Sequence, residues 1–266
     1  MNPSPSAPTT QAQPETVALF VSDLHLQAAM PRTTAAFLDF LVRHAGRAQQ
    51  LYLLGDIFEA WAGDDDLEDA YNGRIVEALA QLSASGVALY WIAGNRDFLA
   101  GERFAQRCGA ILLPDPFIAT IAGRAIVLTH GDAWCTDDEA YMQFRAQVRD
   151  PQWQRQFLAL PLQERKTIIE TLREGSREAQ RGKPCDIMDV NADAIDRLFA
   201  NSGAATMIHG HTHRPACHEQ RHGTQTLLRY VLSDWDLDHG QPRGDWLAID
   251  AGGNIRRCGL DRLHAG

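Results

Sequence analysis

The stretch Leu51–Asp66, LYLLGDIFEAWAGDDD, contains the strongest indication of the fold. Its apolar run Leu51–Leu54 predicts a short buried strand, and Gly55 allows the backbone to turn tightly where that strand ends. Asp56 is therefore predicted at the carboxyl end of a strand, where open α/β folds bind their ligands. A carboxylate there can bridge two divalent cations if other ligands converge on it, whereas an isolated motif of this kind also fits a turn-capping aspartate.

Other segments repeat this pattern of an apolar strand followed by polar residues. Asp23 and His25 follow the run Val17–Val21, and their spacing places both side chains on one face of an extended backbone. The remaining strand ends carry Asn95, Arg96, Asp97 and His130, and then the segment HGHTH with His209, His211 and His213. We expect Asp97 to orient a neighbour rather than to bind an ion.

Composition restricts the function classes. The chain has 266 residues and a net charge of −9 at pH 7, which argues against nucleic-acid binding by its surface as a whole. Its five cysteines form no CxxC pair and are expected to be reduced thiols, and there is no run of about 18 apolar residues that would span a membrane. Residues 1–15 lack the apolar core of a signal peptide and predict a disordered tail before a domain at 16–266, in a cytoplasmic protein.

Periodicity predicts the remaining elements. Helices are expected at about 32–48 and 66–85, and a hairpin is expected from strands 117–121 and 124–129. Strand-like runs at 226–232 and 246–250 are consistent with a second sheet. No role is assigned to Asp65 and Asp66.

An insertion with a helical pattern occupies about 136–186. It holds nine Lys and Arg and nine Asp and Glu residues, so it is neutral while the rest of the chain carries the net charge. Two interpretations are open. It is either an insertion packed on the core with a solvated outer face, or a lid whose apolar side receives a lipid and whose basic groups receive phosphate.

The strand ends together supply two carboxylates, one amide and four imidazoles: Asp23, His25, Asp56, Asn95, His130, His209 and His211. A mixed set of nitrogen and oxygen ligands suits Mn²⁺ or Fe²⁺ better than Mg²⁺. Two such ions can hold a bridging hydroxide and bind a phosphoryl oxygen, which predicts hydrolysis at phosphorus.

The motifs DxH, GD, GN, H and GHxH, in this order at strand ends, resemble those of the calcineurin-like metallophosphoesterases. The longer strings resemble the bacterial UDP-2,3-diacylglucosamine pyrophosphatase family of lipid A biosynthesis over about Val17–Leu237: SDLHL (22–26), GDIFEAWAGDD (55–65), GNRDFL (94–99), HGDAWCTDDEAYMQFR (130–145) and GHTHRP (210–215). The resemblance implies a four-layer αββα sandwich in which the insertion is a helical cap that holds acyl chains.

The resemblance also implies roles for individual residues. One metal ion would be held by Asp23, His25, Asp56 and His211, and the other by Asp56, Asn95, His130 and His209. Substrate contacts would fall on Asn95, Arg96, Asp138, Tyr141, Ser176, Gln180, Lys183 and His209, where Gln180 stands at a position that is often Asn in the family. The catalytic set would be Asp56, Asn95, Arg96 and His209.

Arg96 supports this resemblance on physical grounds. Many phosphoesterases of the superfamily have a histidine after the GN pair, where it can protonate an alkoxide leaving group. Arg96 cannot release its proton near neutral pH, but a phosphate leaving group needs no such acid. Arg96 can instead neutralise charge across a diphosphate.

The implied reaction is hydrolysis of UDP-2,3-diacylglucosamine to 2,3-diacylglucosamine 1-phosphate (lipid X) and UMP, by attack of a metal-bridging water on the α-phosphorus. The implied cofactors are two divalent cations, most consistent with Mn²⁺. We expect a peripheral protein on the cytoplasmic face of the inner membrane, with no nucleic-acid partner and no obligate protein partner. The rival interpretations are another dinuclear phosphodiesterase or lipid pyrophosphatase on the same fold, and a scaffold protein that has lost its chemistry.

Overall fold

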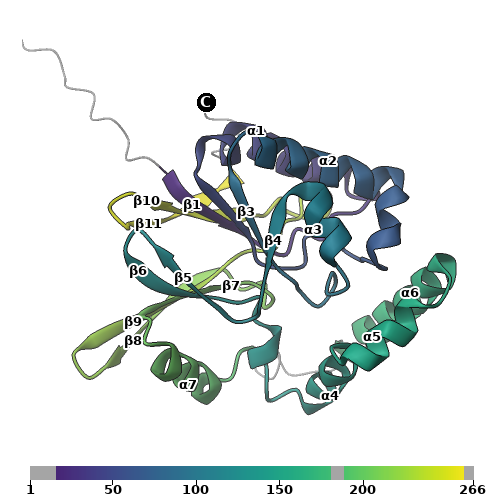
Figure 1. The fold of residues 1–266 in the computed structure, drawn as a ribbon. Helices are drawn as coiled ribbons and strands as arrows, with labels where there is room; N and C mark the ends of the chain where they lie inside the picture. Colours follow the sequence, from purple (N-terminus) through teal and green to yellow (C-terminus); the bar gives the residue numbers. More distant parts are fainter. Residues whose placement is uncertain (1–15, 181–188, 261–266) are drawn as a thin grey trace, which may run out of the picture.

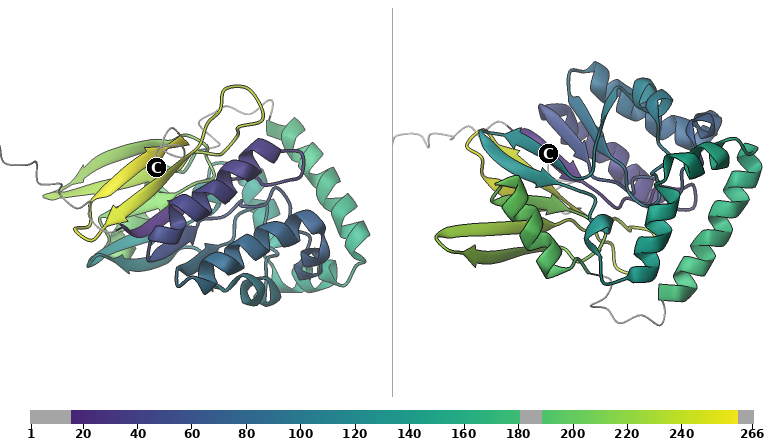
Figure 2. Two further views of the ribbon diagram at one scale, coloured as in Figure 1. Left: turned by 90° about the horizontal axis from the view of Figure 1, so that it is seen from above. Right: turned by 60° about the horizontal axis from the view of Figure 1, so that its bottom comes forward.

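The computed structural model describes residues 16–180 and 189–260, without the side chains of 177–180. The predicted tail at 1–15 lies outside these residues, as do Lys183 and the expected end of the insertion at Asp186. The described chain forms two sheets packed face to face, with helices on the outer face of each (Figures 1 and 2). The four-layer αββα sandwich expected from the motifs is confirmed.

The first sheet has six strands in the described chain, in the order β11-β10-β1-β2-β3-β4. Strands β1 to β4 run parallel, whereas β10 is antiparallel to β1 and to β11. The bounds are β1 (Thr16–Val21), β2 (Gln50–Leu53), β3 (Ala88–Ile92), β4 (Ala110–Leu113), β10 (Asp245–Asp250) and β11 (Ile255–Gly259).

The second sheet has the order β5-β6-β7-β9-β8 in the part of the chain that is described. Its bounds are β5 (Phe117–Ile121), β6 (Arg124–Leu128), β7 (Thr206–His209), β8 (Ala216–His222) and β9 (Gln225–Val231). The predicted hairpin is confirmed as β5 and β6. The placement of 246–250 in this sheet is wrong, because β10 pairs with β1 in the first sheet, with Phe20 opposite Leu247.

Helices α1 (Pro31–Arg43), α2 (Ala70–Ala84) and α3 (Glu102–Cys108) cover the first sheet, and α7 (Ala192–Ser202) covers the second (Figure 1). The expected helix at 32–48 is divided, because α1 ends at Arg43 and a short 3-10 helix, η1 (Ala45–Arg47), follows it. The expected helix at 66–85 begins later, after η2 (Asp64–Glu68), because the Asp69 carboxylate caps α2 by accepting from the backbone N–H of Tyr71. A third 3-10 helix, η3 (Asp132–Trp134), follows β6.

The apolar run Leu51–Leu54 is buried on both faces of the first sheet, as predicted. Leu51 and Leu53 belong to the core beneath the helices, whereas Tyr52 and Leu54 belong to the core between the two sheets. Each residue is at most 4% exposed, which explains why this strand has no polar alternation. Its burial holds Asp56 at a defined point on the edge of the sheet.

The cap consists of α4 (Glu139–Val148), α5 (Pro151–Leu158) and α6 (Leu162–Gln180), which extend as an arm beside the sandwich (Figure 1). Its aromatic side chains Trp153 and Phe157 pack against the core that lies between the first sheet and its helices. Arg165 of α6 is 2% exposed and donates to the Asp65 carboxylate and to the backbone carbonyl of Ala62.

Asp65 and Asp66 therefore have a structural role that their sequence context did not reveal. Besides the Arg165–Asp65 pair, Lys166 of α6 lies 2.5 Å from a carboxylate oxygen of the buried Asp66. These two aspartates bind consecutive cations of α6, so they fix the cap helix to the loop that follows Asp56.

Candidate metal centre

The ends of five strands meet at one edge of the sandwich, between the two sheets. Backbone hydrogen bonds join the loops: Asp23 N donates to Gly55 O at 3.0 Å, and Gly210 N donates to His130 O at 2.9 Å. The side chains that converge there are Asp23 and His25 after β1, Asp56 after β2, Asn95 after β3, His130 after β6, and His211 and His213 after β7.

The backbone is unusual at these residues. Six non-glycine residues of the described chain have positive φ, and Ala122 in the β5–β6 turn is the one outside the site. The other five are Asp23 (53°), His25 (47°), Asp56 (54°), His211 (66°) and His213 (53°). Non-glycine residues avoid this region unless surrounding structure holds them there, and such residues gather at functional sites.

One half of the centre is formed by Asp23, His25 and His213. The Nε2 atoms of the two histidines are 3.3 Å apart, and Asp23 Oδ1 lies 3.4 Å from His213 Nε2. Asp23 Oδ1 is buried and has no hydrogen-bond partner among the described residues, whereas Oδ2 accepts from Ser22 Oγ at 2.5 Å. One carboxylate oxygen and two imidazole nitrogens thus face a common point.

The other half is formed by Asp56, Asn95, His130 and His211. Asn95 Oδ1 is 2.9 Å from His130 Nε2 and 2.8 Å from His211 Nδ1, and Asp56 Oδ1 is 3.7 Å from His130 Nε2. The Nδ1–H of His130 donates to Leu54 O at 2.9 Å, which directs Nε2 at the centre. Asp56 lies between the halves, since Asp23, Asp56 and His130 also have ligand atoms within 4.8 Å of one another.

Glycines allow the two aspartates to approach the neighbouring loops. A Cβ on Gly94 would lie 2.2 Å from Asp56 Oδ1, and a Cβ on Gly210 would lie 2.1 Å from Asp23 Oδ2. Any side chain at these positions would displace a carboxylate. The glycines of the GN and GH pairs are therefore required by close packing around the donors.

Asp97 organises the loops, as expected from its position. Its buried carboxylate accepts from the backbone N–H groups of Gly94 at 2.7 Å, Ile57 at 2.8 Å and Asp56 at 3.3 Å. Burial and the nearby Asp56 carboxylate raise the pKa of Asp97 to about 6.

The electrostatics favour a cation at the centre. Burial opposes the charged form of His130, yet neighbouring carboxylates, of which Asp56 contributes most, raise its pKa to about 9. The convergent donors fit divalent cations with mixed nitrogen and oxygen ligands, and so does the buried Asp23 Oδ1, which makes no hydrogen bond among the described residues and lies 3.4 Å from His213 Nε2.

The model of the calcineurin-like phosphoesterase family matches residues 17–215, which include every residue of this centre. The chain belongs to the calcineurin-like phosphoesterase family.

Three curated relatives of this phosphoesterase share one name. The chain is 50% identical over 222 residues to the UDP-2,3-diacylglucosamine hydrolase of Chromohalobacter salexigens, and the match covers 84% of this chain and 90% of the relative. It is 49% identical to the enzyme of that name from Aromatoleum aromaticum, with 86% and 93% covered, and 47% identical to that of Stenotrophomonas maltophilia, with 88% and 95% covered. The family expected from the motifs is confirmed.

The phosphoesterase does not bring His209 to the metal centre. The buried His209 ring is bonded on both sides: Nδ1 donates to Gly210 O at 2.9 Å, and Nε2 is 3.0 Å from Arg229 Nη1. Burial and the Arg229 charge lower the pKa of His209 to about 3. This placement argues against the predicted roles of His209 as a metal ligand, catalytic group and substrate contact.

His213 lies beside His25 and Asp23, at the position where the family resemblance led us to expect His211. It lies two residues beyond the predicted pair, and its ring faces His25 and Asp23. The GHxH motif is Gly210-His211-Thr212-His213, so counting from the glycine selects His211 and His213. Counting from this glycine is therefore the sequence signal that identifies His213.

Apart from His209, the predicted substrate contacts divide into three groups. Asn95, Arg96, Asp138, Tyr141 and Ser176 line the hollow in front of the centre. Tyr141 donates its hydroxyl to Asp132 at 2.9 Å, which fixes its ring beside His211. For Gln180 the backbone at the end of α6 is described without its side chain, and Lys183 lies outside the described residues.

An apolar cavity of about 390 Å³ adjoins this hollow. It is lined by cap residues, including Phe144, Trp153, Phe157, Ile169 and Leu172, and by Trp61, Phe98 and Leu99 of the body. The cap thus packs on the core, as the first interpretation of the insertion expects, and it also encloses apolar space.

In the described residues of the phosphoesterase, no helix is both long enough and apolar enough to cross a membrane.

Proposed function

We propose that this phosphoesterase hydrolyses the pyrophosphate bond of UDP-2,3-diacylglucosamine, which yields 2,3-diacylglucosamine 1-phosphate and UMP. The observation that carries the proposal is the apolar cavity beside the metal centre, because the two spaces share Asn95 and Arg96. Such an arrangement suits a substrate whose acyl chains are joined to a diphosphate. The shared name of the curated relatives supports this substrate.

We further propose two metal sites, with His213 in place of His209. One ion would be held by Asp23, His25, Asp56 and His213, and the other by Asp56, Asn95, His130 and His211. The mix of imidazole, carboxylate and amide supports Mn²⁺ as the ion. When bound, the two ions would supply a water nucleophile at neutral pH and neutralise charge on phosphoryl oxygens.

We propose that Arg96 binds the diphosphate. Its backbone N–H donates to Asp56 Oδ1 at 2.7 Å, which ties it to the centre. Its Nε is buried without a hydrogen-bond partner in the described part of the chain. An unsatisfied guanidinium donor in a hollow favours phosphate oxygens, and its permanent charge stabilises the departing phosphate as an anion.

We propose that the protein contacts the cytoplasmic face of the inner membrane peripherally. The support is the set of exposed apolar side chains on the three cap helices: Phe144 (37% exposed), Leu158 (41%) and Leu172 (42%). Apolar side chains on the cap can enter the membrane interface and contact a lipid there, while the rest of the protein stays outside the bilayer.

The test of the reaction is hydrolysis of UDP-2,3-diacylglucosamine in detergent with Mn²⁺ and ¹⁸O-water, followed by mass spectrometry of both products. We expect the label on UMP, because the proposed attack is at the α-phosphorus. Label on the lipid product would instead place the attack at the β-phosphorus. Absence of turnover while two ions are bound would contradict the proposed substrate.

Replacing Leu172 with alanine is expected to raise KM for the diacylated substrate by about 5- to 30-fold, since a leucine that covers an acyl chain contributes about 1–2 kcal/mol. Leu172 lines the cavity and is 42% exposed, so its truncation should leave stability unchanged. KM for a deacylated analogue should not change. Steady-state kinetics on both substrates gives the comparison.

The matched control is Val42→Ala on α1, because Val42 is 78% exposed and does not line the cavity. It should behave as the wild type on both substrates. Equal changes of KM for the acylated and deacylated substrates in Leu172→Ala would mean that the cavity does not hold acyl chains.

A further inference from the structure

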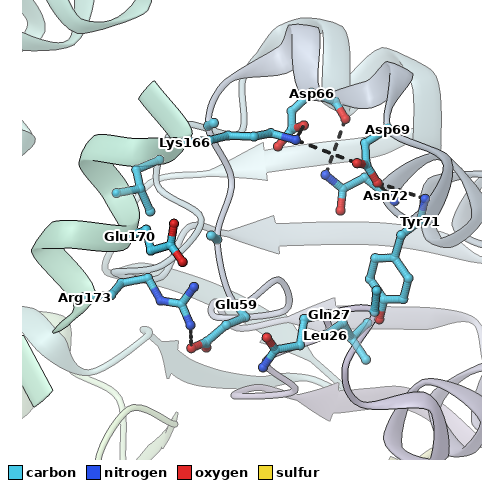
Figure 3. Close-up of a pocket in the computed structure, with 14 residues that line it drawn as sticks. Leu26, Gln27, Glu59, Asp66, Asp69, Tyr71, Asn72, Lys166, Glu170 and Arg173 are labelled. Carbon is cyan, nitrogen blue, oxygen red and sulfur yellow. Dashed lines mark hydrogen bonds and ion pairs between the residues drawn. The ribbon is translucent and has the colours of Figure 1, made fainter. Parts of the chain in front are cut away.

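Glu59 lies between the metal centre and the cap. The residue is 8% exposed, and each of its carboxylate oxygens faces a different partner. Oε2 is 2.7 Å from His25 Nδ1, and Oε1 forms an ion pair with Arg173 of α6. Figure 3 shows the Arg173 guanidinium extending from α6 to the Glu59 carboxylate.

The contact with Glu59 determines which nitrogen of the His25 ring faces the metal centre. An ionised carboxylate can only accept, so the proton lies on His25 Nδ1 and the lone pair lies on Nε2. Nε2 is the atom that faces His213 and Asp23. Glu59 therefore sets both the tautomer and the orientation of the imidazole, as partners of metal-binding histidines generally do.

The contact with Arg173 makes this arrangement depend on the cap. Arg173 lines the apolar cavity and also a second cavity of about 290 Å³ between α6 and the body (Figure 3). Its side chain is 19% exposed and that of Glu59 is 10% exposed, so the pair is largely shielded from water. A shielded ion pair keeps its geometry better than a solvated one, and a shift of α6 would be transmitted to Glu59.

We propose that Glu59 is a positioning residue that links the cap to the metal centre: it orients His25 through one oxygen and is itself held by Arg173 through the other. The position of α6 then influences how tightly the centre binds the ion held by His25. This inference rests on the proposed function, because it takes His25 as a metal ligand.

The chain offers a matched control for the attachment of the cap. Lys166 also joins α6 to the body, through Asp66 at 2.5 Å and Asp69 at 3.7 Å. The residues of that network do not belong to the metal centre. Lys166→Gln therefore removes an ion pair of the same helix, while the Arg165–Asp65 pair still holds α6 on the body and the contacts of Glu59 and His25 remain.

The experiment measures Mn²⁺ binding to the full chain without substrate, by calorimetry and by electron paramagnetic resonance of free Mn²⁺. The wild type should bind two ions. Glu59→Gln should weaken one of them by about 10- to 100-fold and leave the other unchanged. Arg173→Gln should weaken the same ion by about three- to tenfold, Arg173→Lys should restore part of that loss, and Lys166→Gln should match the wild type.

The double variant Glu59→Gln/Arg173→Gln separates a linked pair from two independent contacts. If Arg173 acts through Glu59, the double variant should bind the ion no more weakly than Glu59→Gln alone. Multiplicative losses would overturn the link, and so would equal weakening of both ions or no weakening in Glu59→Gln. Failure of the wild type to bind two ions would instead contradict the proposed metal sites themselves.

Discussion

Asp56→Ala is expected to abolish hydrolysis, with a loss of at least about a thousandfold, and to lower the affinity for both metal ions. Asp56 lies between the two groups of donors and is 2% exposed, so no water or neighbouring side chain can readily replace its carboxylate. Activity assays and metal counting on the purified variant provide the measurement.

The control for this loss is Asp39→Ala. Asp39 is a surface carboxylate on α1 that pairs with Arg43 at 2.6 Å and does not line the hollow in front of the metal centre. It should retain full activity and both ions. If Asp56→Ala still bound two ions with unchanged affinity, Asp56 would not be the shared ligand.

His213→Ala and His209→Ala are expected to behave in opposite ways. His213→Ala should lower activity by at least about a hundredfold and weaken one ion, because its Nε2 faces His25 and Asp23. His209→Ala should keep both ions, because its ring is bonded to Gly210 O and Arg229. It should instead lower the free energy of unfolding by about 1–3 kcal/mol through the loss of buried hydrogen bonds.

Metal titration and urea denaturation of the two variants test this contrast. His209→Gln serves as the conservative comparison, since an amide can retain one of the two buried hydrogen bonds. Loss of an ion in His209→Ala, together with two bound ions in His213→Ala, would restore the ligand set expected from the sequence alone.

Much of the fold was predictable because its central strands are buried on both faces. The runs that became β1, β2 and β3 are continuously apolar, and a polar or glycine residue marks the end of each. Strand β8 (Ala216–His222) shows the opposite case. It has the polar sequence ACHEQRH, is mostly exposed at the edge of the second sheet, and forms because β9 offers it backbone hydrogen bonds.

It was harder to predict from the sequence which sheet each strand joins. Residues 246–250 read as a strand because Trp246, Leu247 and Ile249 favour extended backbone and burial. Their pairing with β1 depends on which apolar surface they cover, and a run that is apolar on both faces does not specify its neighbour.

By itself the sequence determined the family, the order of the strands that carry donors, and six of the seven metal ligands now proposed. Only the tertiary structure placed Glu59 between His25 and Arg173, and it placed His213 rather than His209 among the donors, as the count from the glycine of the GHxH motif also indicates. In an extended backbone His209, His211 and His213 would all share one face. His209 ends β7 and remains in the sheet beside Arg229, whereas the positive φ of His211 and His213 turns their rings toward donors distant in the chain.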